Sequence, residues 1–233
     1  MVNVYSSHNS QKQAAKFASL AYLFTFIIVV FANFGIYNKL IVPGDAVETA
    51  RTIVANEWLF RAGVLSDLVY SIGFIIFTAS LYTIFEETNR RVALVALLFQ
   101  LAYVITWVAL TLKFFDALRL VKGTMYLQIF SDEQAAALAR LFLNARFDRY
   151  YGTLMFYTIG STVFGLLWYK SGYIPKFLSV YGIVACAWCT LCAVVYLAYP
   201  EFESIVNLWL FDLPMAFFSI TLSFWLLTKG LKL

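Results

Sequence analysis

Six runs of about 20 mostly apolar residues, separated by short polar segments, dominate this sequence. An α-helix rises about 1.5 Å per residue, so a run of this length matches a hydrocarbon core about 30 Å thick. Hydrophobic residues make up 62% of the 233-residue chain and charged residues only 13%, a balance that soluble domains do not show. We therefore predict an integral, multi-pass membrane protein, an all-α helix bundle forming one domain over residues 1–233. The expected transmembrane helices cover residues 17–37, 58–85, 92–115, 146–169, 177–199 and 206–227.

The connection between the first two spans carries a helix-start signal. Asp45 follows a turn at Pro43 and precedes Glu48 by three residues, the spacing of a capping box. We expect a short amphipathic helix here, on the outer side of the bundle. It either lies along the membrane surface or packs on the bundle. Its apolar face is expected to hold Val47, Ala50, Ile53 and Val54.

The connection before the fourth span carries the same signal. Ser131 and Gln134 have the spacing of a capping box, which predicts a helix beginning near Asp132. That helix could run unbroken into the fourth span. It would then place the charged residues around Arg146 at the membrane boundary.

Basic residues indicate how the chain is oriented. With six spans, eight Lys and Arg residues of the short segments fall on one side, which the positive-inside rule makes cytoplasmic, together with both termini. The net charge of +4 is spread over loop ends without a basic run, so the expected partner is the lipid bilayer and not a nucleic acid. The eight residues are Lys12, Lys16, Arg90, Arg91, Lys170, Lys176, Lys229 and Lys232.

The residues that usually bind metals are sparse. The single histidine, His8, precedes the first span, so no span can offer a histidine ligand to haem, zinc or copper. Cys186, Cys189 and Cys192 share one span at a spacing of three, and a metal site there would need non-helical backbone within lipid. We interpret them as small buried hydrophobic residues. We expect no metal and no cofactor.

Charged residues within the spans are the main candidates for a site. Asp67 lies well inside the second span, where insertion scales assign about 2.5–3.5 kcal/mol to such a group, so it should face protein or water. Asp212 lies two residues before Pro214, and a proline inside a helix frees a carbonyl that needs another donor. We expect such groups to converge in an outward-facing polar pocket. The predicted ligand-binding residues are Arg61, Asp67, Lys113, Arg146, Asp148, Arg149, Tyr157 and Asp212.

Several functions are compatible with this set. In the simplest, Asp67 and Asp212 only neutralise arginines and fix the packing of the helices. In the functional interpretation, the pocket binds or translocates a small polar or amphiphilic ligand, and its arginines hold a carboxylate or phosphate. An accessory subunit that contacts partner membrane subunits is an alternative. An enzyme using Asp67 and Asp212 as paired carboxylates is less favoured, because the sequence offers no nucleophile and base pair, no metal-ligand spacing and no phosphate-binding glycine loop; we assign no catalytic residue.

Four short motifs resemble a known family. They are Ile41–Asp45 (IVPGD), Leu59–Arg61 (LFR), Asp67–Leu68 (DL) and Ser171–Lys176 (SGYIPK). In this order they resemble an uncharacterised bacterial membrane family, known as the domain of unknown function number four-three-eight-six, over nearly the whole chain. The resemblance implies a six-span protein of the bacterial inner membrane and carries no activity with it. Family members often have an acidic residue and, two positions later, a histidine where this chain has Asn144 and Arg146, so chemistry based on an imidazole there is not expected.

Overall fold

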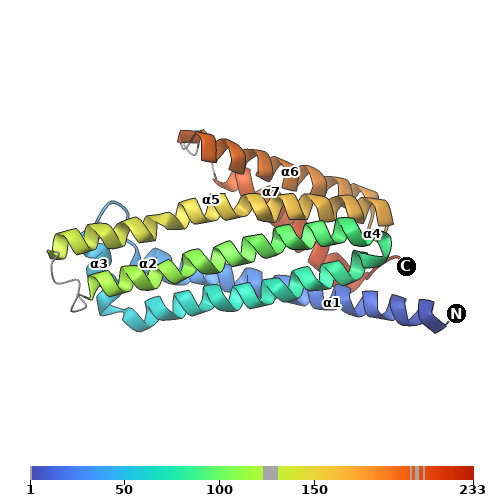
Figure 1. Cartoon of the computed structure of the whole chain (residues 1–233), viewed down its shortest axis with the longest axis horizontal. Helices are drawn as coiled ribbons and strands as arrows, with labels where there is room; N and C mark the ends of the chain where they lie inside the picture. Colours follow the sequence, from blue (N-terminus) through green and yellow to red (C-terminus); the bar gives the residue numbers. More distant parts are fainter. Residues whose placement is uncertain (1, 123–130, 200, 203–204, 207) are drawn as a thin grey trace. The chain divides into compact units, whose positions relative to one another are not determined.

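The computed structural model describes residues 2–122, 131–199, 201–202, 205–206 and 208–233, without the side chains of 2–7, 144–150 and 208–209. The chain is 90% helical, and no strand occurs among the described residues, so the all-α prediction is confirmed (Figure 1). The elements are α1 (Val2–Val30), the π-helix η1 (Phe31–Tyr37), α2 (Asn38–Leu40), α3 (Ala46–Ala55), α4 (Glu57–Val121), α5 (Asp132–Ser171), α6 (Lys176–Ala198) and α7 (Leu208–Thr228).

The helix α4 consists of two arms that meet at Asn89. This residue alone within α4 has non-helical backbone angles, φ −163° and ψ 93°. Its side-chain oxygen accepts a hydrogen bond from the backbone N–H of Val92 at 3.1 Å, so Asn89 caps the second arm. The chain therefore turns between the expected spans 58–85 and 92–115.

Both predicted helix starts are present, and the second has the reciprocal hydrogen bonds of a capping box, whereas the Glu48 side chain pairs with Arg51. The carboxylate of Asp45 accepts from the N–H of Glu48 at 2.8 Å, and α3 follows. Ser131 and Gln134 exchange two hydrogen bonds of 3.1 and 3.3 Å, and α5 continues from Asp132 through the expected fourth span.

The buried face of α3 differs from the expected one. Thr49 and Ile53 are its buried residues, while Val47 and Val54 are 48% and 45% exposed. Ile53 packs in the core cluster, so α3 packs on other helices through a narrow i, i+4 stripe. Thr49 can be buried in this stripe because its hydroxyl donates hydrogen bonds to the backbone carbonyls of Val42 and Asp45.

Four helical segments of the described residues are long and apolar enough to cross a membrane. They are His8–Leu40, Glu57–Val121, Lys176–Ala198 and Leu210–Thr228. The second of these holds two of the spans expected from the sequence, 58–85 and 92–115, one in each arm of α4. The total of six spans, and the outer position of the amphipathic helices, stay predictions.

The chain divides into two compact units. Unit 1 contains residues 1–24, 73–105 and 151–233, and unit 2 contains residues 25–72 and 106–150. The expectation of one domain over 1–233 stays a prediction, and each unit is described by itself.

In unit 1, α6 and α7 pack closely and share two side-chain hydrogen bonds. Pro214 has no N–H for the carbonyl of Leu210 one turn earlier, and the indole N–H of Trp188 donates to that carbonyl at 3.2 Å. The predicted need for another donor is thus met from α6. The hydroxyl of Tyr181 donates to the carbonyl of Pro214 at 3.0 Å.

The packed face of α6 is made of small residues. At Gly182, an added Cβ would lie 2.3 Å from the ring of Phe218, so only glycine allows this approach of α7. Cys186, Cys189 and Cys192 are at most 1% exposed on the same helix, which confirms that they are buried.

Candidate functional site

The candidate site is centred on Asp67, in the first arm of α4 and within unit 2. Asp67 is fully buried, and its Oδ2 accepts a hydrogen bond of 3.0 Å from the hydroxyl of Tyr37. Tyr37 is also fully buried and is the last residue of η1. Burying an ionised carboxylate costs several kcal/mol unless charged or hydrogen-bonding partners compensate it, so this position is energetically special in an otherwise apolar helix.

The π-helix places the ring of Tyr37. Its wider backbone turns the residues that follow relative to an α-helix, and such segments often occur at functional sites. Ala32, Ile36 and Tyr37 are the buried residues of η1. An added Cβ on Gly63 would meet the Tyr37 ring at 3.0 Å, so the glycine lets α4 and η1 approach closely.

Aromatic rings surround the hydroxyl and carboxylate pair. Tyr37 meets Phe114 edge-on at 5.5 Å and Phe60 at 6.4 Å, and the two phenylalanine rings lie 6.1 Å apart. All three rings are at most 1% exposed, so water is excluded on this side and the interaction with Asp67 takes place in a low-dielectric setting.

Further buried polar side chains belong to unit 2. Ser71, one turn after Asp67, donates from its hydroxyl to the Asp67 backbone carbonyl at 2.9 Å. Thr25 and Thr111 are at most 1% exposed, and Trp107 packs on Tyr70 at 5.4 Å between ring centroids. The interior of unit 2 therefore contains several groups capable of hydrogen bonding.

The first two cations of the predicted set lie in exposed ion pairs. Arg61 pairs with Glu57 at 2.8 Å with about half of its side chain exposed, and its guanidinium lies 5.8 Å from the Phe115 ring centroid. Lys113 pairs with Asp116 at 3.6 Å and is also about half exposed. Each is partly neutralised by a carboxylate one helical turn away.

The structure leaves the grouping of the remaining candidates untested. Arg146, Asp148 and Arg149 belong to the α5 backbone in unit 2, and their side chains lie outside the described set. Tyr157 and Asp212 belong to unit 1. Tyr157 packs against two other aromatic rings, those of Phe74 at 5.5 Å and Tyr103 at 5.3 Å, and Asp212 lies in α7.

Tyr37 and Arg140 make contacts at this site and are not among the residues predicted from the sequence. Arg140 in α5 donates to the backbone carbonyl of Val42 at 2.9 Å and to the hydroxyl of Thr49 at 3.1 Å. It thus fixes the IVPGD loop and the start of α3 within unit 2. A tyrosine at the end of an apolar run carries no pattern that would select it. The position of Arg140, six residues before the charged segment that begins at Arg146, is a weak signal.

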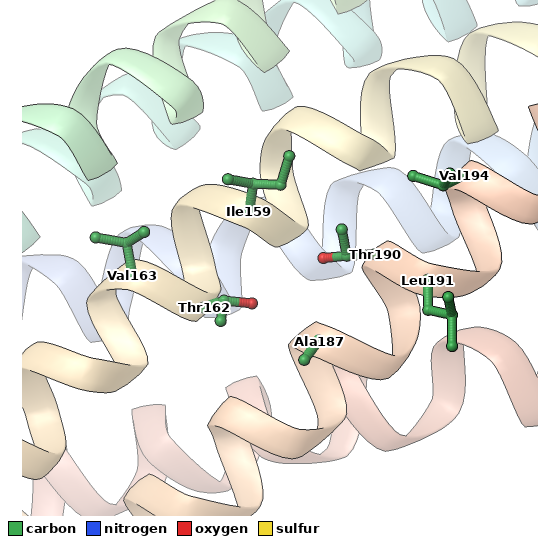
Figure 2. A pocket seen from close by; sticks show the side chains of 7 residues that line it. All are labelled: Ile159, Thr162, Val163, Ala187, Thr190, Leu191 and Val194. Carbon is green, nitrogen blue, oxygen red and sulfur yellow. The ribbon is translucent and has the colours of Figure 1, made fainter.

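A separate groove lies between α5 and α6 in unit 1, and Figure 2 shows the side chains that line it. Its volume is about 400 Å³ and its walls are almost entirely apolar. The hydroxyls of Thr162 and Thr190 bond to helix carbonyls and to Thr158, so they add little polarity. The lining residues are Ile159, Thr162, Val163, Ala187, Thr190, Leu191 and Val194, and none belongs to the predicted set.

Among the described residues, no three His, Cys, Asp or Glu side chains are grouped to hold a metal ion. What the described part offers is a buried, hydrogen-bonded carboxylate within apolar helices that are long enough to cross a membrane. These features define an all-helical, membrane-compatible protein.

Within that class, the chain belongs to the family described as "Domain of unknown function (DUF4386)", whose model matches residues 17–230. The resemblance noted from the four motifs is therefore confirmed over nearly the whole chain. No curated protein and no solved structure matches the chain.

Proposed function

We propose that this protein crosses the bacterial inner membrane six times, with both termini in the cytoplasm, and binds a small polar or amphiphilic ligand through an anionic group. The binding site lies in unit 2, around Asp67. The carrying observation is the complete burial of this carboxylate, with its hydrogen bond from Tyr37, on an apolar helix. An ionisable residue within a membrane-spanning segment is costly to bury and is therefore a candidate for a functional site.

The sign of the ligand charge follows from the charged residues proposed for the site. Arg61 and Lys113 are already paired with carboxylates of their own helix, so we assign the anionic group of the ligand to Arg146 and Arg149. In this arrangement Asp67 orients the guanidinium group of an arginine. Another N–H edge of the same guanidinium binds a carboxylate or phosphate with two parallel hydrogen bonds. The aromatic rings around Tyr37 provide the apolar surface that an amphiphilic molecule also needs.

The contacts of Arg140 support the same location. They hold the IVPGD loop and α3 to α5 within unit 2, and α5 also carries Arg146 and Arg149. A fixed loop keeps the surrounding groups pre-organised, which lowers the entropy cost of binding.

The test is purification of the full chain in mild detergent, followed by native mass spectrometry of everything that stays bound. The wild type is compared with Arg146→Gln/Arg149→Gln, with Asp67→Asn and with Arg51→Gln as a control. Arg51 is a suitable control because it is an exposed residue of α3 that pairs with Glu48. We expect a small molecule on the wild type and the control and its loss from the other two variants, each of which must keep a cooperative melting transition.

Two results would overturn the proposal. The first is a ligand retained equally by all four folded proteins, which would leave the charged residues with a role in packing only. The second is a stoichiometric partner protein with no variant-sensitive small molecule, which would identify the chain as an accessory subunit.

A further inference from the structure

Tyr173, in the turn between α5 and α6, joins several parts of unit 1. Its hydroxyl accepts from the side-chain amide of Gln11 in α1 at 3.3 Å and contacts the hydroxyl of Thr88, at the turn of α4, at 3.5 Å. Its backbone carbonyl accepts from the N–H of Lys232, next to the C-terminal residue, at 3.0 Å. Figure 1 shows that the two marked chain ends and the turn of α4 lie at the same end of this unit. We call the set of residues that make these contacts the Tyr173 junction.

The Tyr173 junction is held firmly. The Tyr173 ring stacks on Phe85 at 6.2 Å, and Phe85 meets Trp168 edge-on at 4.5 Å. Gln11, only 2% exposed, also donates to the carbonyl of Ile84 at 3.0 Å and to Glu87 at 3.4 Å. The positions of the surrounding segments are therefore fixed relative to one another within unit 1.

Each segment that meets at Tyr173 brings exposed basic residues. They lie within three residues of a contact in the junction, apart from Lys16, which is one helical turn further along α1. They are Lys12 and Lys16 in α1, Arg90 and Arg91 at the turn of α4, Lys170 and Lys176 on either side of the α5–α6 turn, and Lys229 and Lys232 near the C-terminus.

These charges are only partly balanced within the described part of the chain, where Arg90 interacts with Tyr82 and Glu86. None of its ion pairs involves any of the eight residues, and the acidic residues of the same turn, Glu86 and Glu87, are two against eight. The positive potential of the junction can therefore attract a negatively charged partner outside the protein.

Exposed aromatic side chains lie beside the basic ones. Phe177, next to Lys176, is 73% exposed, and Tyr169, next to Lys170, is 46% exposed. The ammonium group of Lys176 lies 5.8 Å from the centroid of the Tyr169 ring. Aromatic rings collect where the headgroups of a bilayer meet its hydrocarbon, so this combination fits an amphiphile better than a free anion.

From this geometry we propose that the Tyr173 junction binds the headgroup of an anionic phospholipid. Lys170, Lys176 and Lys232 contact the phosphate, with Arg90 and Arg91 adding attraction. Phe177 and Tyr169 contact the first part of the acyl chains. The site lies within unit 1 and does not depend on the ligand proposed for Asp67.

The experiment uses the full chain in detergent and measures binding of phosphatidylglycerol by native mass spectrometry and by the rise in melting temperature. Phosphatidylethanolamine and inorganic phosphate are the comparison ligands. The test variant is Lys170→Gln/Lys176→Gln/Lys232→Gln. The matched control is Lys39→Gln/Arg51→Gln/Arg119→Gln, which removes three exposed charges from unit 2.

We expect phosphatidylglycerol to bind the wild type and the control alike, and to bind the test variant at least about tenfold more weakly, because the variant lacks three of the charges that attract an anionic headgroup. A second variant, with Arg at the same three positions, should retain binding, which keeps the test valid if the Gln variant folds poorly. Equal binding by the test variant, equal loss in the control, or equal stabilisation by inorganic phosphate would each overturn the proposal.

Discussion

The two units differ in whether their basic residues form ion pairs. In unit 2, the cations of α3 and of the ends of α4 pair with carboxylates, as Arg51 does with Glu48 and Lys122 with Glu57. In unit 1, the basic residues around Tyr173 make no ion pair within the described residues. Local pairing cancels the field a few ångströms away, whereas an unpaired cluster extends it to about the Debye length. Unit 1 is therefore the part suited to a charged surface, and unit 2 the part suited to an internal site.

The buried polar side chains of the two units also differ in charge. Unit 2 buries the carboxylate of Asp67 completely, whereas in unit 1 the fully buried Gln100 is neutral and the carboxylate of Asp212 is only partly buried. The amide of Gln100 donates to the carbonyl of Tyr157 at 3.2 Å and to Ser161 at 2.9 Å. Replacing a neutral amide costs little stability. Replacing a buried carboxylate costs more, because its hydrogen-bond donor is then left buried without that acceptor.

Replacing the buried polar group of each unit should give the largest difference. Asp67→Ala is expected to lower the free energy of unfolding by about 3 kcal/mol, because it leaves a cavity and a buried Tyr37 hydroxyl without this acceptor. Gln100→Leu should cost about 1 kcal/mol or less, because it removes both a donor and a buried acceptor and keeps the volume. Equilibrium unfolding in mixed micelles measures both. Equal losses would contradict the contrast between the units.

Close helix packing, and not charge, should account for the stability of unit 1. Gly182→Val is expected to cost about 2 kcal/mol, since the new side chain must displace the ring of Phe218. Gly152→Ala is the control, because an added Cβ there meets no described atom within 4 Å. The melting temperature of each variant in detergent gives the answer, and adding Phe218→Leu should partly rescue Gly182→Val. A Gly182 variant as stable as the wild type would show that α6 and α7 are not closely packed.

The hydrogen bond from Trp188 to the carbonyl of Leu210 should contribute about 1 kcal/mol. Trp188→Phe removes the donor, and Pro214→Ala restores a main-chain N–H to the same carbonyl. In a double-mutant cycle, the loss from Trp188→Phe should therefore shrink in the Pro214→Ala background. Additive losses would mean that the indole stabilises α7 in another way.

The smallest effect is expected for the exposed ion pairs of unit 2. Glu57 pairs with Arg61 at 2.8 Å and with Lys122 at 2.7 Å. Glu57→Gln should lower the melting temperature slightly at low ionic strength and not at all in high salt, because exposed pairs are weak and screened. A decrease that persists in high salt would show that this carboxylate has a larger role.

Features set by a few neighbouring residues could be predicted from the sequence. The caps at Asp45 and Ser131 and the free carbonyl near Pro214 depend on local chemistry, and all are present. The family was also recognisable, because its motifs are short and lie in order.

Features set by contacts distant in sequence could not be predicted. The partner of Asp67 is Tyr37, thirty residues away, and the π-helix that places it has no readable signature. The burial of Thr49 instead of Val47 follows from a loop hydrogen bond that hydropathy does not report. The division into two units arises from packing along continuous helices, without a linker that would mark it in the sequence.

The single break at Asn89 has a consequence for how the chain enters a membrane during synthesis. Only one residue of extended backbone joins the two arms of α4. Neither arm could therefore enter a membrane far ahead of the other. The acidic and basic residues flanking Asn89 would each oppose crossing of the turn through hydrocarbon. In the six-span arrangement that we propose, the two arms are therefore expected to enter together as a hairpin, with the charged turn remaining on the side from which it came.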